Sequence, residues 1–148
     1  LEEIFTVRSY KIIVEKYGDQ PAVSEAIVKL DVSGETVYAA AEGNGPVNAL
    51  DNALLQAILR FYPELERMHL SDYKVRVIDE KDATAAKVRV LIESTDYENR
   101  WSTVGVSGNV IEASWNALLD SMRYALIGKE RPNAQTAGRT ERQGIVNH

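Results

Sequence analysis

Hydrophobic and polar residues alternate in two regions of the chain, and each region is followed by a longer stretch with helical spacing. In the first region a strand is predicted over residues 26–32, where every second residue from Ala26 is hydrophobic and Lys29 and Asp31 lie on the other face. Turn formers at 33–35 connect it to a strand over 36–42 in an antiparallel hairpin. β-Branched and aromatic residues over 10–14 predict one further strand. Three antiparallel strands are therefore expected.

A glycine-rich turn, Gly43-Asn44-Gly45-Pro46, follows these strands and opens a helix. Pro46 suits the first helical turn because its missing N–H group would have no partner there, and Asn44 or Gly45 is the expected cap. The helix is expected to end at Tyr62, because the residue before a proline resists the α-helical region. Hydrophobic residues at helical spacing predict one face packed on the sheet: Val47, Leu50, Leu54, Ile58 and Phe61.

The same order of elements returns in the second half of the chain. Strands are predicted over 72–77, 86–92 and 100–106, and Ser107-Gly108-Asn109 then opens a second helix that Gly128 ends. The hydrophobic face of that helix comprises Ile111, Trp115, Leu118, Met122 and Leu126, and Trp101 and Trp115 are expected to fill the core between sheet and helix.

The spacing of the two halves indicates an internal repeat. The run Asn52-Ala53-Leu54-Leu55 recurs without change 64 residues later, and Tyr73 follows Tyr10 by 63 residues. Chance similarity of two amphipathic units is the alternative. The repeat predicts an α+β fold of two βββα units related by pseudo-twofold symmetry, with antiparallel sheets and the helices packed on one face.

These patterns also predict the domain organisation. Residues 1–7 are expected to end a linker, and 8–127 to form one domain with repeats at 8–62 and 72–127. The polar, aperiodic residues 128–148 are expected to be a flexible tail.

Composition narrows the class of protein. The 148 residues suffice for a hydrophobic core, cysteine is absent, and no apolar run approaches the length of a membrane span. With a net charge of −5 and no dense basic stripe, we expect neither a nucleic-acid partner nor a membrane, and a cytoplasmic location. Because the chain starts at Leu1 and not at methionine, we expect a fragment of a larger protein.

Catalytic and metal-binding patterns are not recognisable in the sequence. His69 is expected in a connector and His148 is terminal, so no histidine pair has metal-ligand spacing and no catalytic residue is predicted. The acidic cluster at 79–82 is interpreted as a solvated turn. Gly43-Asn44-Gly45 lacks the lysine of a phosphate loop, which leaves nucleotide binding as a minor alternative. Free N–H groups at this helix start would still suit an anion such as an amino-acid carboxylate.

Several blocks, in order, resemble one known family. Residues 43–54, Leu70-Ser71-Asp72-Tyr73-Lys74-Val75-Arg76-Val77, the block 101–107 and the block 111–115 are similar to the C-terminal regulatory domain of 2-isopropylmalate synthases and citramalate synthases. The resemblance covers about residues 8–127. It implies a homodimeric βββα-βββα domain that binds leucine or isoleucine as feedback inhibitor, and the blocks look closer to the citramalate branch, whose end product is isoleucine.

The resemblance also implies what this chain lacks. In the family an upstream TIM-barrel catalytic domain condenses acetyl-CoA with a 2-oxo acid and uses a divalent metal. None of the metal-binding or catalytic sequence blocks of that barrel is present here. We therefore expect no cofactor or metal in this domain, and we do not expect this chain alone to be an enzyme. A purely structural dimerisation module and a small stand-alone enzyme are the alternatives.

The resemblance assigns candidate effector contacts residue by residue. Many family members carry a larger or acidic residue at the positions of Val47 or Asn48, so that contact is expected to differ here. We expect the effector carboxylate to meet N–H groups at a helix start, and its ammonium group to meet carbonyls or the Asn48 side chain. A core role is the alternative for the apolar members. The candidates are Gly45, Pro46, Val47, Asn48, Leu70, Tyr73 and Val77, with looser matches at Ala86, Gly108 and Asn109.

Overall fold

The computed structural model describes residues 4–78 and 87–130 and divides the chain into two compact units, residues 1–66 and 67–148. Unit 1 contains β1 (Phe5–Glu15), β2 (Val23–Val32), β3 (Glu35–Gly43) and α1 (Pro46–Leu59). A 3₁₀ helix, η1 (Pro63–Arg67), follows. Unit 2 contains β4 (His69–Ile78), β5 (Lys87–Thr95), β6 (Arg100–Ser107) and α2 (Val110–Glu130).

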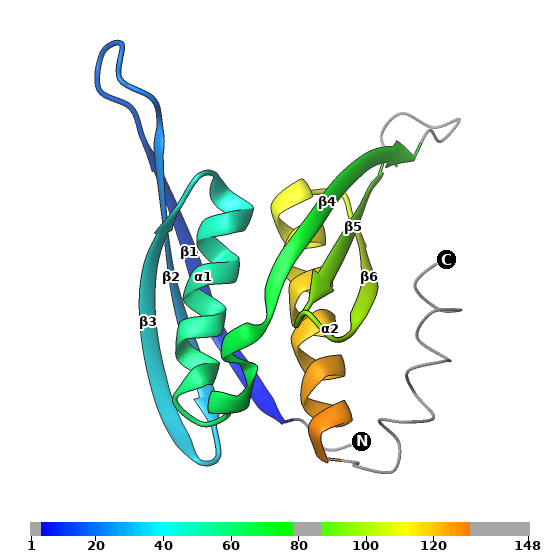
Figure 1. The fold of residues 1–148 in the computed structure, drawn as a ribbon. Coiled ribbons are helices and arrows are strands. Elements are labelled where there is room, and N and C mark those ends of the chain that lie inside the picture. Colours follow the sequence, from blue (N-terminus) through cyan, green and yellow to red (C-terminus); the bar gives the residue numbers. More distant parts are fainter. Residues whose placement is uncertain (1–3, 79–86, 131–148) are drawn as a thin grey trace. The chain divides into compact units, whose positions relative to one another are not determined.

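Each unit is a three-stranded antiparallel sheet with one helix on one face (Figure 1). The strand orders are β1-β2-β3 and β4-β5-β6, so each strand pairs with its neighbour in sequence. We call these sheet 1 and sheet 2. The predicted βββα repeat is confirmed.

The strand registers reproduce the predicted spacing of the repeat. The β1–β2 ladder skips one residue at Arg8, and the β4–β5 ladder skips one at Ser71, 63 positions later. After each skip, Tyr10 pairs with Val28 and Tyr73 pairs with Ile92. A β-bulge at the same place in both sheets supports a true duplication over chance similarity.

Each unit has its own hydrophobic core between sheet and helix. The alternating residues of β2 are buried, as the strand pattern predicted, and so are most residues of the two predicted helical faces. In unit 1 the fully buried side chains include Leu30, Leu50, Leu54 and Ile58; in unit 2 they include Val90, Ile92, Met122 and Leu126.

Some predicted boundaries were wrong. β1 begins at Phe5, whose buried side chain and pairing with Val32 place residues 5–7 in the sheet. His69 begins β4 and does not lie in a connector. α1 ends at Leu59, three residues before the predicted end at Tyr62. α2 continues past Gly128 to Glu130, because one glycine within a helix costs only about 1 kcal/mol.

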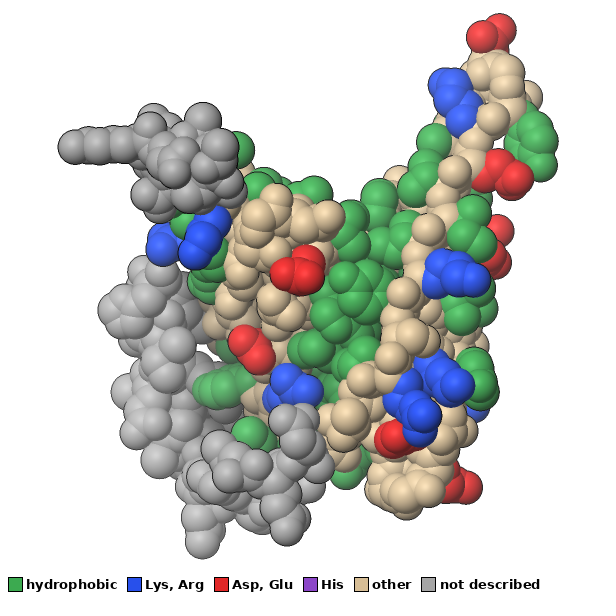
Figure 2. Space-filling view, turned by 180° about the vertical axis from the view of Figure 1, so that it is seen from behind, with side chains coloured by type: hydrophobic (Ala, Val, Ile, Leu, Met, Phe, Trp, Pro, Cys, Tyr) green, Lys and Arg blue, Asp and Glu red, His purple; other side chains and the backbone are tan. Residues whose placement is uncertain are grey.

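Charge is mixed along unit 1. The β1–β2 hairpin extends past the start of α1 (Figure 1), and Figure 2 shows acidic, basic and hydrophobic side chains together on it. In the described ranges, neither helix combines the length and apolar character that a bilayer crossing requires.

A buried hydroxyl network joins sheet 2 to α2, and both tryptophans lie in this core as predicted. The Trp101 indole N–H donates to Ser121 Oγ at 3.0 Å and to the Ser121 carbonyl at 3.2 Å. Ser94 Oγ lies 2.6 Å from Ser121 Oγ. The network satisfies polar groups that cannot reach water.

We expect Ser121→Ala to lower the free energy of unfolding by about 1–3 kcal/mol, because it leaves the buried Ser94 hydroxyl without its partner. Ser102→Ala, on the opposite face of the same sheet, is the control and should change stability by less than about 0.5 kcal/mol. Urea denaturation followed by tryptophan fluorescence measures both. Equal effects of the two changes would contradict a structural role for the network.

Candidate functional site: the two helix starts

The start of α1 has no side-chain cap. Gly45 is the N-cap residue, its backbone is extended (φ −168°, ψ 177°), and Pro46 occupies the first turn. The first helical hydrogen bond runs from Ala49 N–H to the Gly45 carbonyl at 2.9 Å. Within the described residues, no side chain accepts a hydrogen bond from the N–H groups of Val47 and Asn48. Two donors at the positive end of the helix dipole are therefore available to an anion.

The Asn48 side chain holds the turn together. Its Oδ1 accepts the Asn44 N–H at 2.9 Å and lies 3.5 Å from Asn52 Nδ2, which also donates to the Glu42 carbonyl at 3.0 Å. Oδ1, which we had expected could accept an effector's ammonium group, is thus already engaged. Asn52, which was not among the candidates, fixes the end of β3 to α1. The sequence could not select Asn52 for this role, because the run Asn-Ala-Leu-Leu that contains it is identical to the run that contains Asn116 in the second repeat.

Gly43 is required by this packing. A Cβ added to it would overlap the Ala49 nitrogen and meet Asn48 Oδ1 at 2.7 Å. The glycine-rich turn is therefore built around close approach of β3 to the helix start.

The start of α2 is closed by its own side chains. Asn109 Oδ1 accepts the N–H groups of Ile111 at 2.8 Å and Glu112 at 3.1 Å. Ser107 Oγ donates to Glu112 Oε1 at 2.6 Å and accepts the Asn109 N–H at 3.2 Å. This is a complete capping arrangement with an acidic residue in the first turn. The Gly108–Asn109 turn thus leaves fewer donors for an anion than its counterpart in unit 1.

Tyr73 is anchored to α2 by a hydrogen bond. Its hydroxyl lies 3.0 Å from Ser114 Oγ, and Ser114 donates its own proton to the Val110 carbonyl at 2.7 Å. The Tyr73 hydroxyl is therefore the donor in this pair. Ser114 was not among the predicted site residues. A serine within a helix commonly bonds to a carbonyl of the preceding turn, so its presence in the sequence does not indicate a second partner such as Tyr73.

The apolar candidates of β4 differ in exposure. Leu70 is half-buried, whereas Val77 is 67% exposed and so has no core role within its unit. Val77 pairs with Val88, which pairs with Ser107, so Val77 lies at the end of sheet 2 from which α2 starts. Ala86 lies outside the described residues.

The candidates therefore form two groups, one in each unit. Gly45, Pro46, Val47 and Asn48 surround the start of α1. In unit 2, Val77 lies at the end of the sheet next to the Gly108–Asn109 turn, and Tyr73 lies in its middle and reaches α2 at Ser114. Leu70 lies toward the opposite end of the sheet.

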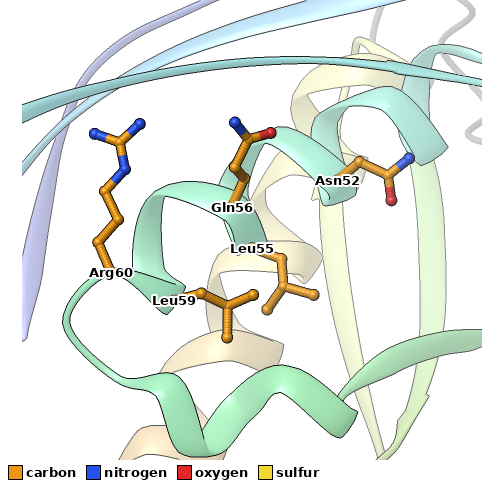
Figure 3. Close-up of a pocket in the computed structure, with 5 residues that line it drawn as sticks. All are labelled: Asn52, Leu55, Gln56, Leu59 and Arg60. Atoms are coloured by element: carbon orange, nitrogen blue, oxygen red, sulfur yellow. The ribbon is translucent and has the colours of Figure 1, made fainter.

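A shallow hollow lies on the solvent face of α1, away from these candidates. Its volume is about 460 Å³, and Leu55 and Leu59 point the same way in it, while the side chains of Gln56 and Arg60 extend on the opposite side (Figure 3). Asn52 completes its lining. No candidate residue lines it.

Titratable groups with shifted pKa values lie elsewhere. A hydrogen bond from Thr36, together with nearby Arg8, lowers the pKa of the Asp31 carboxyl, and desolvation raises that of Asp120. Over 4–78 and 87–130, no cluster of three or more histidine or acidic side chains could hold a metal ion.

Comparison with known proteins identifies the family. The sequence model of the LeuA allosteric (dimerisation) domain matches residues 1–126. The chain belongs to this domain family. The described architecture and the earlier resemblance agree with that assignment.

Citramalate synthases and 2-isopropylmalate synthases are among the curated relatives of this LeuA allosteric domain. It is 53% identical over 125 residues to the (R)-citramalate synthase of Geobacter sulfurreducens, covering 84% of this chain and 24% of that protein. It is 50% identical over 131 residues to the Aquifex aeolicus enzyme of the same name, covering 88% of this chain and 25% of that protein. A 2-isopropylmalate synthase of Shewanella sp. (strain MR-7) is 35% identical over 110 residues, covering 74% and 20%. The chain thus spans about a quarter of the length of these relatives.

Proposed function

We propose that this LeuA allosteric domain binds a branched-chain amino acid, with isoleucine favoured over leucine, and that binding gives end-product feedback inhibition. One observation carries the proposal: the start of α1 leaves two N–H donors uncapped, whereas the equivalent start of α2 is capped by Asn109. An amino-acid carboxylate suits the uncapped donors. The higher identity to citramalate synthases supports isoleucine.

The whole protein is proposed to be a cytoplasmic acetyl-CoA-dependent acyltransferase of the citramalate synthase type. Its TIM-barrel catalytic domain would hold a divalent metal and precede this domain, and the assembly would be a homodimer. The names of the relatives support this parent activity. For the effector to inhibit, it must bind more tightly to a state of the assembly in which the catalytic domain is less active than to the active state.

Titration calorimetry of the 148-residue chain with isoleucine, leucine and valine is the direct test. We expect isoleucine to bind more tightly than valine by only about tenfold or less, since one buried CH₂ contributes about 0.8 kcal/mol. Absence of heat with all three amino acids at millimolar concentration would instead favour a structural dimerisation module.

A transplanted cap tests where the carboxylate binds. Gly45→Asn would give α1 the cap that Asn109 provides to α2, and the extended backbone at Gly45 accepts any residue without a nearby clash. We expect isoleucine affinity to fall at least about tenfold, because charge-assisted hydrogen bonds are worth roughly 1.5–3 kcal/mol. Stability should be unchanged or slightly raised.

Gly45→Ala is the matched control, since it adds a methyl group in open space and no cap. It should retain most of the affinity. If Gly45→Asn binds isoleucine like the unmodified chain, the carboxylate does not lie at the start of α1.

A further inference from the structure

Asn44 is the only asparagine in the sequence that a glycine follows, and the pair lies in the turn that opens α1. Asparagine is a chemically labile residue. Its side-chain carbonyl carbon can bond to the main-chain nitrogen of the next residue and close a cyclic imide. A glycine at that next position favours the reaction, because it has no β-carbon and adopts a wide range of backbone conformations. We call Asn44 and Gly45 the Asn-Gly pair.

Both reacting groups of the Asn-Gly pair are free in the part of the chain that the structure describes. No described residue forms a hydrogen bond with the Asn44 carboxamide, and none accepts the Gly45 N–H. Asn44 is exposed and lies between β3 and α1. A Cβ added to Gly45 would meet nothing within 4 Å, so the space beside the attacking nitrogen is open. Hydrogen bonding and steric crowding therefore do not prevent ring closure.

Asn48 and Asn109 lack this combination of features and serve as internal comparisons. Asn109 uses Oδ1 to cap α2, and the next residue is the β-branched Val110. Asn48 lies within α1, and the N–H of the next residue, Ala49, donates to the Gly45 carbonyl at 2.9 Å. A nitrogen held in a helical hydrogen bond is not available to attack a side chain. Ring closure is thus expected to be slow at both positions.

We propose that the Asn-Gly pair is a site of spontaneous deamidation. The Gly45 main-chain nitrogen attacks Asn44 Cγ, a C–N bond forms, the bond from Cγ to Nδ2 breaks, and Nδ2 leaves as ammonia with the amide proton of Gly45. Water then opens the cyclic imide at one of its two carbonyl carbons. Opening at Cγ gives an aspartate, and opening at the main-chain carbonyl gives an isoaspartate. In sum, water is consumed and ammonia is released, so no oxidant, reductant or cofactor is needed.

Either product places a negative charge at the start of α1. Asn44 directly precedes the N-cap residue Gly45, and no described side chain caps the N–H groups of Val47 and Asn48. A carboxylate at this place is stabilised by the positive end of the helix dipole. It also repels a second carboxylate that approaches the same N–H groups. We therefore expect deamidation to weaken binding of the amino-acid effector, and this consequence, unlike the modification itself, rests on the proposed function.

An isoaspartate also changes the geometry of the turn. The Asn44 N–H donates to Asn48 Oδ1 at 2.9 Å, and Gly43 approaches the Ala49 nitrogen so closely that an added Cβ would overlap it. An isoaspartate adds one atom to the main chain between the end of β3 and the start of α1. A longer connection cannot preserve both contacts unchanged, so the end of β3 shifts relative to the helix.

Peptide mapping by mass spectrometry tests the site. The folded 148-residue chain is incubated at physiological temperature and pH, and exchange of the side-chain amide for a carboxylate is followed at each asparagine. We expect Asn44 to be converted at least about tenfold faster than Asn48 and Asn109, because glycine leaves the attacking nitrogen unhindered. Conversion of Asn44 no faster than theirs would overturn the proposal.

Gly45→Ala is the matched variant for the modification. It adds one methyl group in open space at a position with an extended backbone, so the fold is retained. We expect conversion of Asn44 to slow at least about tenfold, since alanine shields the nitrogen and narrows the range of backbone conformations. Circular dichroism before and after incubation checks that both chains stay folded. An unchanged rate in this variant would also overturn the proposal.

Asn44→Asp and Asn44→Gln test the effect on the effector. Asn44→Asp reproduces one product, and we expect calorimetry to show isoleucine binding at least about threefold more weakly than to the original chain. Asn44→Gln is the neutral control and should bind like the original. Equal affinity of both variants would overturn the effect on the effector and leave the modification site in place. Absence of isoleucine binding by the original chain would overturn the proposed function, whereas the peptide map decides the modification independently.

Discussion

Gly105→Ala is expected to destabilise unit 2 by about 3 kcal/mol or more, a larger effect than most single substitutions have. Gly105 lies on β6, where a Cβ would overlap the Ala113 carbonyl oxygen and lie 2.9 Å from the Ala113 carbonyl carbon and 3.0 Å from the Ala117 nitrogen of α2. These are backbone atoms of a helix, so no side-chain rotation relieves the clash. The helix must move away from a sheet on which it is closely packed.

Both tryptophans are in unit 2, so their fluorescence reports this change directly. A fall of 3 kcal/mol corresponds to roughly 12–24 °C in the melting temperature of a domain this small. Gly45→Ala is the control, because nothing lies within 4 Å of the added methyl group and no positive φ is involved. A melting temperature within 3 °C of the original for Gly105→Ala would show that β6 and α2 are less closely packed than described.

Leu54→Ala is expected to destabilise unit 1 by about 3–5 kcal/mol. Leu54 is fully buried between α1 and sheet 1, and its truncation removes hydrophobic contacts and leaves a cavity. Far-ultraviolet circular dichroism in urea measures the loss, because unit 1 contains no tryptophan.

Leu55→Ala is the matched control for this change. Leu55 is the same residue type one position later, but it is half-buried and lines the shallow hollow on the solvent face of α1. It should cost less than about 1 kcal/mol, since little of its surface is buried by the core. Equal effects at 54 and 55 would mean that the two faces of α1 are buried alike in solution.

Most of the fold could be predicted from local sequence pattern. The alternation in β2 and β5 and the helical spacing after Pro46 and Asn109 reflect burial on one side of each element, and burial on one side is what periodicity records. The boundaries were less certain. Phe5 joins β1 and Gly128 stays in α2 because of pairing and helix continuity, which outweigh weak local preferences.

The candidate site was predictable only as a set of positions. The resemblance selected both helix starts, but it could not tell that Asn109 caps its own helix while Gly45 leaves α1 open. It also could not tell that Asn48 Oδ1 is engaged by Asn44. Side-chain hydrogen bonds depend on rotamers and on the distance to neighbouring backbone, and a residue's type does not specify either.

The sequence by itself determined the duplicated βββα architecture and the family, because repeat spacing, hydrophobic period and turn residues are properties of the chain as written. Only the tertiary structure decided which residues that are far apart in the sequence lie in contact with one another. By the repeat spacing, Gly105 corresponds to Ala41, yet only the approach of α2 to β6 makes a glycine necessary in the second repeat. The pairing of Arg76 with Arg89, and of Glu25 with Glu42, likewise follows from strand register. Contacts between residues far apart in sequence depend on packing, which local pattern does not encode.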